Sequence, residues 1–367
     1  MPRNKINILS IDGGGIRGII PATVLVHIEK RIREKKGDDK RIADYVDLVA
    51  GTSTGAILGA MLLVPDEHGR PKFTAEDALD FYVQYGEEIF NQSKKRGTFG
   101  QLLVGAARYT EKRLESLMVK KLGDCMLSEL LKPCIITSYN MYNGTAVFFN
   151  SREEKAEKGD FLLREVLRST SAAPTYFNPA MLGFHVQNGQ RMVNLDGGVF
   201  ANNPAMCAYA EARGTVFPGW QDDLNPNKAF PTARNMQMLS LGTGGGYPDL
   251  GSPEKASRWK LLTWAKKTPD IMMDGALNTV NYQVQKLYES LDGVEVKNYK
   301  RVDFPRPANG AKPPYNADMA DASDKNVKTL QQCGQLTVQH SNNNAEESLD
   351  AFVDKMIVAV EGSHNLA

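Results

Sequence analysis

The sequence predicts an α/β fold, in which a mostly parallel central sheet is flanked by layers of helices. Three observations predict it. Apolar stretches of strand length alternate with helical stretches in the first part of the chain. Glycine-rich turns follow several of these apolar stretches directly. The order strand, helix, strand, helix implies parallel strands joined by right-handed crossovers.

The individual elements follow from hydrophobic periodicity. Residues 6–11 form a continuous apolar run, as expected of a strand buried on both faces. A helix follows over residues 21–35, with Pro21 in its first turn and apolar residues at helical spacing. The other expected strands are residues 45–50, 134–138, 146–150, 192–195 and 236–241. The other expected helices are residues 54–63, 75–89, 111–121, 161–169, 204–213, much of 257–291, 324–338 and 345–360.

Length and composition indicate one elaborated domain. The chain has 367 residues, of which 42% are hydrophobic and 24% charged, which is ordinary for a soluble globular enzyme. The motifs described below come from widely separated strands and must share one sheet edge. We therefore expect a single domain over residues 1–367, with a core at about 5–245 and a C-terminal helical extension at about 250–367. The proline-rich segment 303–316 is expected to be a surface connection.

Charge and targeting signals restrict location and partners. Lys plus Arg (44) nearly balance Asp plus Glu (43), so no global field favours a nucleic-acid polymer as partner. There is no signal-peptide pattern, and the most apolar window, residues 48–64, falls short of the ~20 apolar residues of a membrane span. Four widely spaced cysteines predict reduced thiols. We expect a cytoplasmic protein with, at most, peripheral contact with membranes.

The stretch GTSTG at residues 51–55 lies between an expected strand and an expected helix. This is the G-x-S-x-G pattern of a nucleophile elbow, where a sharp turn leaves the serine hydroxyl exposed at the edge of the sheet. Ser53 is the candidate nucleophile. Taken alone, the stretch can also be interpreted as a Ser/Thr helix cap.

The glycine-rich loop DGGGIRG follows the first strand and matches the G-x-G-x-x-G pattern of dinucleotide sites. Such a site needs an acidic residue at the end of the next strand, where this chain has Ala50 and Gly51 instead. The glycines fit an oxyanion hole better, because they allow positive φ angles and close approach of backbone N–H groups. Arg17 either adds positive charge or fixes the loop through a salt bridge.

No histidine is placed as a general base for Ser53. The five histidines, at positions 27, 68, 185, 340 and 364, lie within a helix, in turns, in the tail or in polar surroundings. By contrast, NLDGG ends a strand with Asp196 in a glycine-lined corner. A turn aspartate is the alternative interpretation of this residue.

The three stretches DGGGIRG, GTSTG and DGG, in this order and each after an apolar strand, resemble the patatin-like phospholipase family. The resemblance extends to the segments RSTSAAPTYFNP and LSLGTG and to the C-terminal helix. It implies a three-layer patatin-like fold and a Ser53–Asp196 dyad that cleaves fatty acyl esters of membrane glycerophospholipids. It also implies an oxyanion hole made by Gly13, Gly14, Gly15 and the backbone amide of Thr54. No metal or cofactor is expected.

Two further expectations concern lipid access and regulation. Residues 93–109 mix cations, glycines and bulky apolar side chains, which is typical of an interfacial or lid segment. Its candidate lipid contacts are Lys94, Lys95, Arg96, Phe99, Leu102 and Leu103. Some bacterial family members are defence effectors switched on by cyclic nucleotides, and the single-domain layout resembles theirs. The resemblance thus implies a cyclic-nucleotide activator. Residues 247–316, which are more than catalysis needs, are the candidate regulatory surface, and homo-oligomer assembly is another way to restrain hydrolysis of the cell's own lipids.

Three alternatives to a phospholipase stay open at this point. The first is a soluble carboxylesterase or thioesterase with the same dyad. The second is a nucleotide-dependent dehydrogenase, which the missing acidic residue disfavours. The third is a binding or storage protein with a vestigial site, against which the intact Ser53, Asp196 and loop glycines argue.

Overall fold

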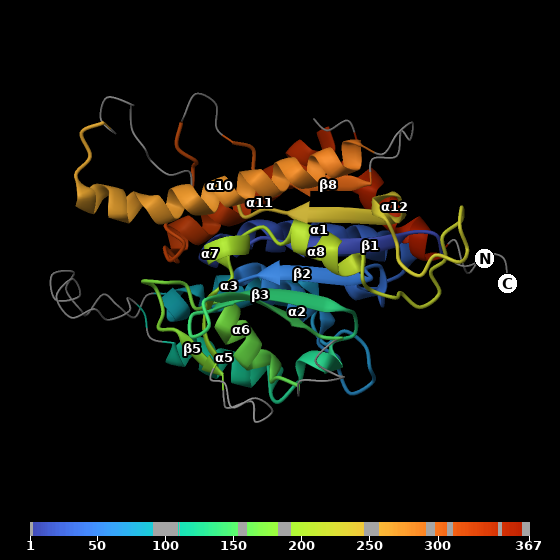
Figure 1. Cartoon of the computed structure of the whole chain (residues 1–367), viewed down its shortest axis with the longest axis horizontal. Helices are drawn as coiled ribbons and strands as arrows, with labels where there is room; N and C mark the ends of the chain where they lie inside the picture. Colours follow the sequence, from blue (N-terminus) through green and yellow to red (C-terminus); the bar gives the residue numbers. More distant parts are fainter. Residues whose placement is uncertain are drawn as a thin grey trace.

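Figure 1 shows the computed structural model of the chain. It describes residues 3–90, 109, 111–152, 160–182, 192–245, 257–290, 298–306, 311–343 and 347–361.

A central sheet of eight strands organises the described residues. The strand order is β5-β6-β3-β2-β1-β7-β8, and β4 also pairs with β3. The pairs joining β3, β2, β1, β7 and β8 are parallel, whereas β4, β5 and β6 join through antiparallel pairs. The strands are β1 (Ile6–Ile11), β2 (Leu48–Thr52), β3 (Cys134–Asn140), β4 (Thr145–Asn150), β5 (Ala180–Leu182), β6 (Met192–Asp196), β7 (Met236–Leu241) and β8 (Tyr299–Val302).

Helices cover both faces of this sheet (Figure 1). The larger layer, on one face, contains α1 (Ile19–Lys36), α2 (Thr54–Leu63), α3 (Ala75–Phe90), α5 (Lys112–Leu122), α6 (Leu163–Thr170), α11 (Asp324–Asn343) and α12 (Leu349–Glu361). The other face carries α8 (Ala205–Ala212) and the long α10 (Leu261–Glu289), with the short α7 (Gly198–Ala201) packed against α10. The expected α/β fold with a flanked central sheet is therefore confirmed.

The two helical layers explain why the central strands are largely apolar. In β1, Ile6 and Ile8 belong to the core beneath α8 and α10, whereas Leu9 and Ile11 belong to the core beneath α1 and α2. All four side chains are at most 1% exposed. A strand buried on both faces needs apolar residues at successive positions, and this is the pattern from which the strand was predicted.

The structure differs from the sequence-based expectation at a few element boundaries. The second strand begins at Leu48 rather than at residue 45, because its parallel register starts with the pair Ile8↔Leu48. Tyr45 and Val46 are buried core residues that precede the strand. The strands β5 and β8 are absent from the prediction. Both are short and lie at opposite edges of the sheet, and β8 has the polar sequence YKRV.

The C-terminal part packs directly against the rest of the chain. The strand β8 extends the sheet by pairing with β7, and α11 and α12 both contact α1. The parallel strands β1, β2, β7 and β8 end at one common edge of the sheet. The candidate active site lies at this edge, where residues from both parts of the chain meet.

Candidate active site

Ser53 lies in the sharp turn between β2 and α2. Its backbone has φ 52° and ψ −121°, a positive-φ conformation that L-residues rarely adopt, so the turn is strained. A Cβ atom on Gly51 would collide with the backbone of Ala56, and one on Gly55 would collide with the carbonyl of Ile11. The N–H of Ser53 donates to the hydroxyl of Thr170 over 2.8 Å. This is the geometry of a nucleophile elbow.

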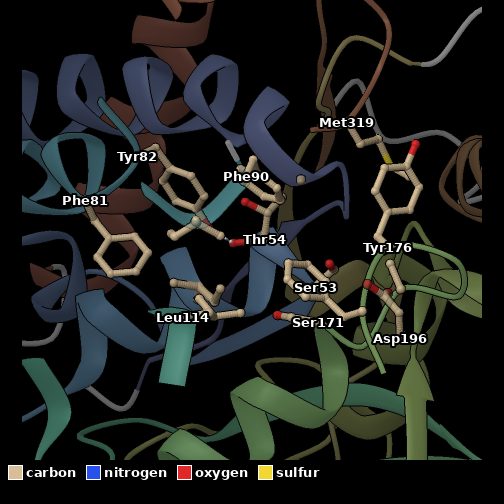
Figure 2. Close-up of a pocket in the computed structure, with 15 residues that line it drawn as sticks. Ser53, Thr54, Phe81, Tyr82, Phe90, Leu114, Ser171, Tyr176, Asp196 and Met319 are labelled. Carbon is tan, nitrogen blue, oxygen red and sulfur yellow. Dashed lines mark hydrogen bonds between the residues drawn. The ribbon is translucent and has the colours of Figure 1, made fainter. Parts of the chain in front are cut away.

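The sheet brings Asp196 to the same place. Thr52, the last residue of β2, pairs with Thr137 of β3. The next residue of β3, Ser138, pairs with Asp196, the last residue of β6. Because β2 is parallel and β6 antiparallel to β3, the two strands run toward each other along one side of β3. Their C-terminal ends therefore meet, and Ser53 and Asp196 lie close together (Figure 2).

The carboxyl group of Asp196 is held in a dry environment. The residue is only 6% exposed, and its Oδ1 accepts a 2.7 Å hydrogen bond from the N–H of Gly198. Burial raises the pKa of Asp196 to about 6, while hydrogen bonds from the Ser53 side chain and the Gly198 amide oppose this rise. A carboxylate with a raised pKa is a stronger base than an ordinary aspartate.

The glycine-rich loop after β1 is clamped from several sides. The carbonyl of Gly13 accepts hydrogen bonds from the Thr243 hydroxyl (2.8 Å) and the Asn202 amide (3.3 Å). The N–H of Gly13 donates to the carbonyl of Asn202 over 2.9 Å. Gly13 is thus used to hold the loop, and its N–H is not directed at a ligand as the sequence analysis expected.

The next two glycines of the loop are arranged differently. Gly15 has φ 59°, a left-handed conformation that favours glycine, whereas Gly14 is extended with φ 171° and Gly13 is not left-handed either. A Cβ atom on Gly14 would instead collide with the side chain of Thr243. Within the described part of the chain, the N–H groups of Gly14 and Gly15 have no hydrogen-bond partner.

Arg17 supports the glycine-rich loop through a carbonyl group of the loop. Its side chain is 4% exposed, and Nε donates to the carbonyl of Gly14 over 3.3 Å. Among the described residues, the Arg17 side chain therefore binds the backbone and no carboxylate, in contrast to the salt bridge considered from the sequence. The N–H of Ile16 donates to the carbonyl of Met319, so the C-terminal part also holds the loop.

A mostly apolar pocket leads away from Ser53 (Figure 2). Its empty volume is about 520 Å³, which includes the space at its open mouth. Ser53, Asp196 and Met319 lie towards one side of the pocket, and Phe81 and Leu114 lie towards the other (Figure 2). Gly15 and Thr54 also line it. The remaining lining residues are Ile57, Tyr82, Ile89, Phe90, Ser171, Ala173, Tyr176 and Phe177. A serine hydroxyl at the head of an apolar pocket is suited to a ligand with a hydrocarbon chain.

A family model described as patatin-like phospholipase matches residues 9–209, which carry Ser53, Asp196 and the glycine loop. The chain belongs to the patatin-like phospholipase family. The suspected family is thereby confirmed, and with it the membership of this chain in a family of hydrolases.

Plant relatives match the patatin-like chain over most of its length. Patatin-like protein 2 of Oryza sativa subsp. indica is 34% identical, and the match covers 98% of this chain and 89% of the relative. Patatin-like protein 2 of Arabidopsis thaliana is 35% identical, and the match covers 82% of this chain and 75% of the relative. Patatin-2-Kuras 1 of Solanum tuberosum is 32% identical, and the match covers 95% of this chain and 91% of the relative. The solved structure of VipD from Legionella pneumophila matches with a TM-score of 0.33 and 11% identity, over 91% of this chain and 67% of VipD.

A buried ion cluster lies behind the glycine loop of the patatin-like chain. Asp12 is fully buried and pairs with Arg301 of β8, whose guanidinium also donates to Ser240 (2.9 Å) and Asp303 (2.7 Å). Burial lowers the pKa of Arg301, but the carboxylates of Asp12 and Asp303 more than offset this and raise it. Oδ1 of Asp303 accepts the N–H of Gly244, in the loop that also carries Thr243.

Sequence reasoning missed this cluster and the contribution of the C-terminal part to the patatin-like site. Arg301 and Met319 both lie beyond the residues matched by the family model. Asp12 itself carried a signal, because an acidic residue at the end of a buried strand requires a partner. Its partner could not be chosen among the many arginines of the sequence.

The other residues considered from sequence lie elsewhere or outside the described residues. His27 pairs with Asp350 at 2.7 Å, and none of the described histidines lines the pocket. His185 and His364 lie outside the described residues, as do Lys94, Lys95, Arg96, Phe99, Leu102 and Leu103 of the expected lid. All four cysteines are free thiols, and Cys134 and Cys333 are buried. In the part of the chain that the structure describes, no helix has the length and apolar character needed to cross a membrane.

Proposed function

We propose that this protein is a lipid acyl hydrolase of the phospholipase A type, with Ser53 as nucleophile and Asp196 as base. One observation carries the proposal. A strained serine and a buried aspartate meet at the head of an apolar pocket. Family membership supports the same assignment. The substrates would be fatty acyl esters of membrane glycerophospholipids.

In the first half-reaction, Asp196 accepts the proton of the Ser53 hydroxyl while Oγ attacks the ester carbonyl carbon. The carbonyl oxygen becomes an oxyanion, which the N–H groups of Gly14 and Gly15 and of Thr54, the first residue of α2, would stabilise. Asp196 then gives the proton to the departing alcohol oxygen. The products are an acyl-Ser53 ester and the lyso-lipid.

In the second half-reaction, Asp196 takes a proton from water, whose oxygen attacks the acyl carbon. The proton returns to Oγ of Ser53 as the fatty acid leaves, so the enzyme is restored. Throughout, the 2.7 Å bond from Gly198 orients the carboxylate. A pKa of about 6 leaves Asp196 ionised at neutral pH and lets it hold the serine proton better than an ordinary aspartate.

The apolar pocket favours long acyl chains over small soluble esters. Phe81 and Leu114 offer only apolar contacts at the side of the pocket away from Ser53, and Ile57 adds another apolar side chain to the lining (Figure 2). A soluble carboxylesterase or thioesterase is the second candidate, because the same dyad would cleave any ester that reaches Ser53. The dehydrogenase alternative loses its support, since the glycine loop belongs to a hydrolase family.

The test is release of fatty acid from mixed phospholipid vesicles by the wild type, Ser53→Ala and Asp196→Asn. Hydrolysis by the wild type alone, unaffected by EDTA, is the expected result. Equal hydrolysis by all three proteins would overturn the dyad. Cleavage of short-chain soluble esters together with inactivity on vesicles would select the esterase instead.

Three finer expectations extend this proposal: activation by a cyclic nucleotide, a role in antiviral defence and homo-oligomer assembly. Their support is the family resemblance. Including a panel of cyclic nucleotides in the vesicle assay tests the first, because an activator must raise the rate and bind the protein. We also propose that residues 1–367 form one domain, which the pairing of β8 with β7 supports.

A further inference from the structure

Residues 258–269 have an unusual composition within a nearly neutral chain. Their sequence, RWKLLTWAKKTP, contains four cations and no acidic residue, although the whole chain carries a net charge of only +1. It also contains Trp259 and Trp264, two of the three tryptophans of the protein. Cations mixed with tryptophan and leucine are typical of helices that lie in a membrane interface.

The start of α10 exposes this apolar content instead of burying it. Leu261 is 86% exposed, Trp264 is 44% exposed and Met272 is 65% exposed. Residues separated by three, eight or eleven positions share one side of a helix, so these three side chains form a line along α10. We refer to Leu261, Trp264 and Met272 as the α10 stripe. Trp259 packs edge to face against Trp264, with ring centroids 4.9 Å apart.

Cations border the stripe. Lys260, immediately before α10, and Arg258 are exposed, and Lys267 lies half-buried one turn after Trp264. On a helical wheel, positions 260 and 267 fall beside the line of the stripe, on the same flank. An exposed apolar line next to a line of positive charge is complementary to an anionic lipid surface.

The helix carries the stripe to the edge of the sheet at which the pocket lies. The middle of α10 contacts α7, and Cε of Met273 lies 3.6 Å from the position that a Cβ on Gly198 would take. Gly198 is the residue whose amide binds Asp196. At 1.5 Å per residue, Trp264 lies about 14 Å along the helix from Met273. Figure 1 shows this half of α10 extending past α7 at the edge where β2 ends.

The opposite half of α10 is anchored to the body of the protein. Val284 is 1% exposed, and Val280 and Tyr288 pack against the same core beneath α8 and α10. Asn281 accepts a 2.8 Å hydrogen bond from Asn203. The helix is therefore fixed at its C-terminal half, while its N-terminal half presents the stripe to the surroundings.

We propose that the α10 stripe and its flanking cations dock the protein on an anionic bilayer surface. This rests on the proposed function, because docking places the nearby pocket within reach of phospholipids. Trp264, Leu261 and Met272 would enter the boundary between headgroups and acyl chains, while Lys260 and Lys267 contact the anionic headgroups. The segment lies in the region 247–316, which the sequence analysis assigned to regulation, and it is separate from the expected lid at 93–109.

Binding without turnover tests the proposal directly. The full chain with Ser53→Ala is sedimented with vesicles of phosphatidylcholine alone, or of phosphatidylcholine mixed equally with phosphatidylglycerol. We expect binding to the mixed vesicles that weakens with added salt, and little binding to the neutral vesicles. Equal, salt-independent binding to both vesicles would overturn the charge complementarity.

Two variants remove the two components of the surface. The first is Leu261→Ser, Trp264→Ala, Met272→Ser, and the second is Lys260→Glu, Lys267→Glu. Each cation near an anionic surface contributes roughly fivefold in binding, so the charge variant should bind at least tenfold more weakly. The apolar variant should also bind at least tenfold more weakly, because it loses the side chains that enter the interface. Matched controls on other helices are Leu336→Ser with Val358→Ser, and Lys325→Glu with Lys328→Glu, all exposed. Unchanged binding by the two stripe variants, or an equal loss in the controls, would overturn the proposal.

Fluorescence and soluble substrates separate docking from catalysis. In a Trp220→Phe background, the remaining emission comes from Trp259 and Trp264, and it should shift to the blue only with anionic vesicles. With Ser53 intact, the stripe variant should lose hydrolysis of vesicles but keep kcat/KM on a short-chain soluble ester. Docking without hydrolysis of any ester by the wild type would refute the proposed function and leave the docking surface standing. Self-association that the stripe variant abolishes would identify a second copy as the occupant and overturn the proposal.

Discussion

Asp12 and Arg301 form a buried ion pair that joins the start of the glycine loop to β8. Nη1 and Nη2 of Arg301 lie 3.0 and 2.6 Å from Oδ1 and Oδ2 of Asp12, although the two residues are 289 positions apart. Gly13, the next residue after Asp12, is bound by Thr243 and Asn202. The pair thus fixes one end of a loop whose next two N–H groups face no partner among the described residues.

We expect Arg301→Gln to reduce kcat on a short-chain ester roughly a hundredfold with little change in KM, as when one oxyanion donor is lost. Arg301 touches no reacting atom in this assignment and acts by positioning the loop. Without it, Asp12 keeps a buried charge without compensation or takes up a proton, and either change disturbs the loop. The kinetics of the purified variant, with its melting temperature, measure the effect.

A second change distinguishes positioning from a general loss of structure. Asp12→Asn combined with Arg301→Gln removes both charges. The kcat of the double variant should therefore be at least tenfold higher than the kcat of Arg301→Gln. The control is Arg213→Gln, which removes an exposed arginine whose side chain donates to the carbonyl of Pro231. This variant should keep the wild-type kcat. A folded Arg301→Gln protein with normal kcat would refute the positioning role.

The pH dependence of kcat/KM should show an acid limb with a midpoint near pH 6. Asp196 must be ionised to accept the serine proton, and its pKa is raised to about 6 by burial. Below that pH the rate should fall about tenfold per pH unit, because only the ionised fraction reacts. Initial rates on a soluble ester between pH 4 and pH 8 measure this directly.

Asp12 provides the control for this profile, since burial raises its pKa to about 6 as well, against the effect of Arg301. If Asp196 is the base, Asp12→Asn lowers the plateau but keeps the acid limb. A limb that disappears in Asp12→Asn would assign the titration to Asp12, and a rate that stays constant down to pH 4 would contradict a base of this pKa.

The sequence predicted the parts of the site that are encoded locally. The elbow around Ser53 was recognisable because its glycines are required by contacts with the next helix and the neighbouring strand. Asp196 was recognisable because it ends a strand and precedes two glycines. In both cases the physical constraint and the residues that satisfy it lie within a few positions of each other.

Features that depend on distant contacts were not predictable in the same way. Gly13 was expected to direct its N–H at a ligand, but that N–H binds Asn202, which is nearly two hundred positions away. The partner of Asp12 lies on a short, polar edge strand that has no apolar pattern. The α10 stripe was included within an expected helix, and only its exposure distinguishes it from a core-facing surface.

Asp196→Asn should stabilise the fold at neutral pH while it abolishes activity. In the folded protein the pKa of Asp196 is about 6, above its ordinary value of 3.8, so the folded state binds this proton more tightly than the unfolded state. The free energy of unfolding therefore decreases as the pH rises from about 4 to about 6. Replacing the ionised carboxylate by an amide should recover up to about 3 kcal/mol at pH 7.

Denaturant unfolding of the wild type and Asp196→Asn at pH 7 and pH 4 measures this difference. The amide oxygen can still accept the N–H of Gly198, so the variant keeps the contact that orients the side chain. The stabilisation should be clear at pH 7 and small at pH 4, where the wild-type carboxyl is already protonated in the folded state. A variant that is less stable than the wild type at pH 7 would show that the ionised form is not disfavoured by burial.

The far end of the pocket should set the preferred length of the acyl chain. Leu114 of α5 lines the pocket at the end away from Ser53 and is 3% exposed (Figure 2). Leu114→Phe adds bulk there without changing the polar groups at the reacting end. We expect at least a tenfold lower kcat/KM on long-chain esters and an unchanged value on short-chain esters, since only long chains reach this position.

Val119→Phe is the matched control, because Val119 lies on the same helix but is 52% exposed and does not line the pocket. It should leave the chain-length profile unchanged. A comparison of chain lengths in a series of soluble esters, with melting temperatures to detect overpacking at Leu114, decides between the outcomes. An equal loss on short and long chains in a folded Leu114→Phe protein would mean that the acyl chain leaves Ser53 by another route, and the apolar pocket would then have to hold a different part of the substrate.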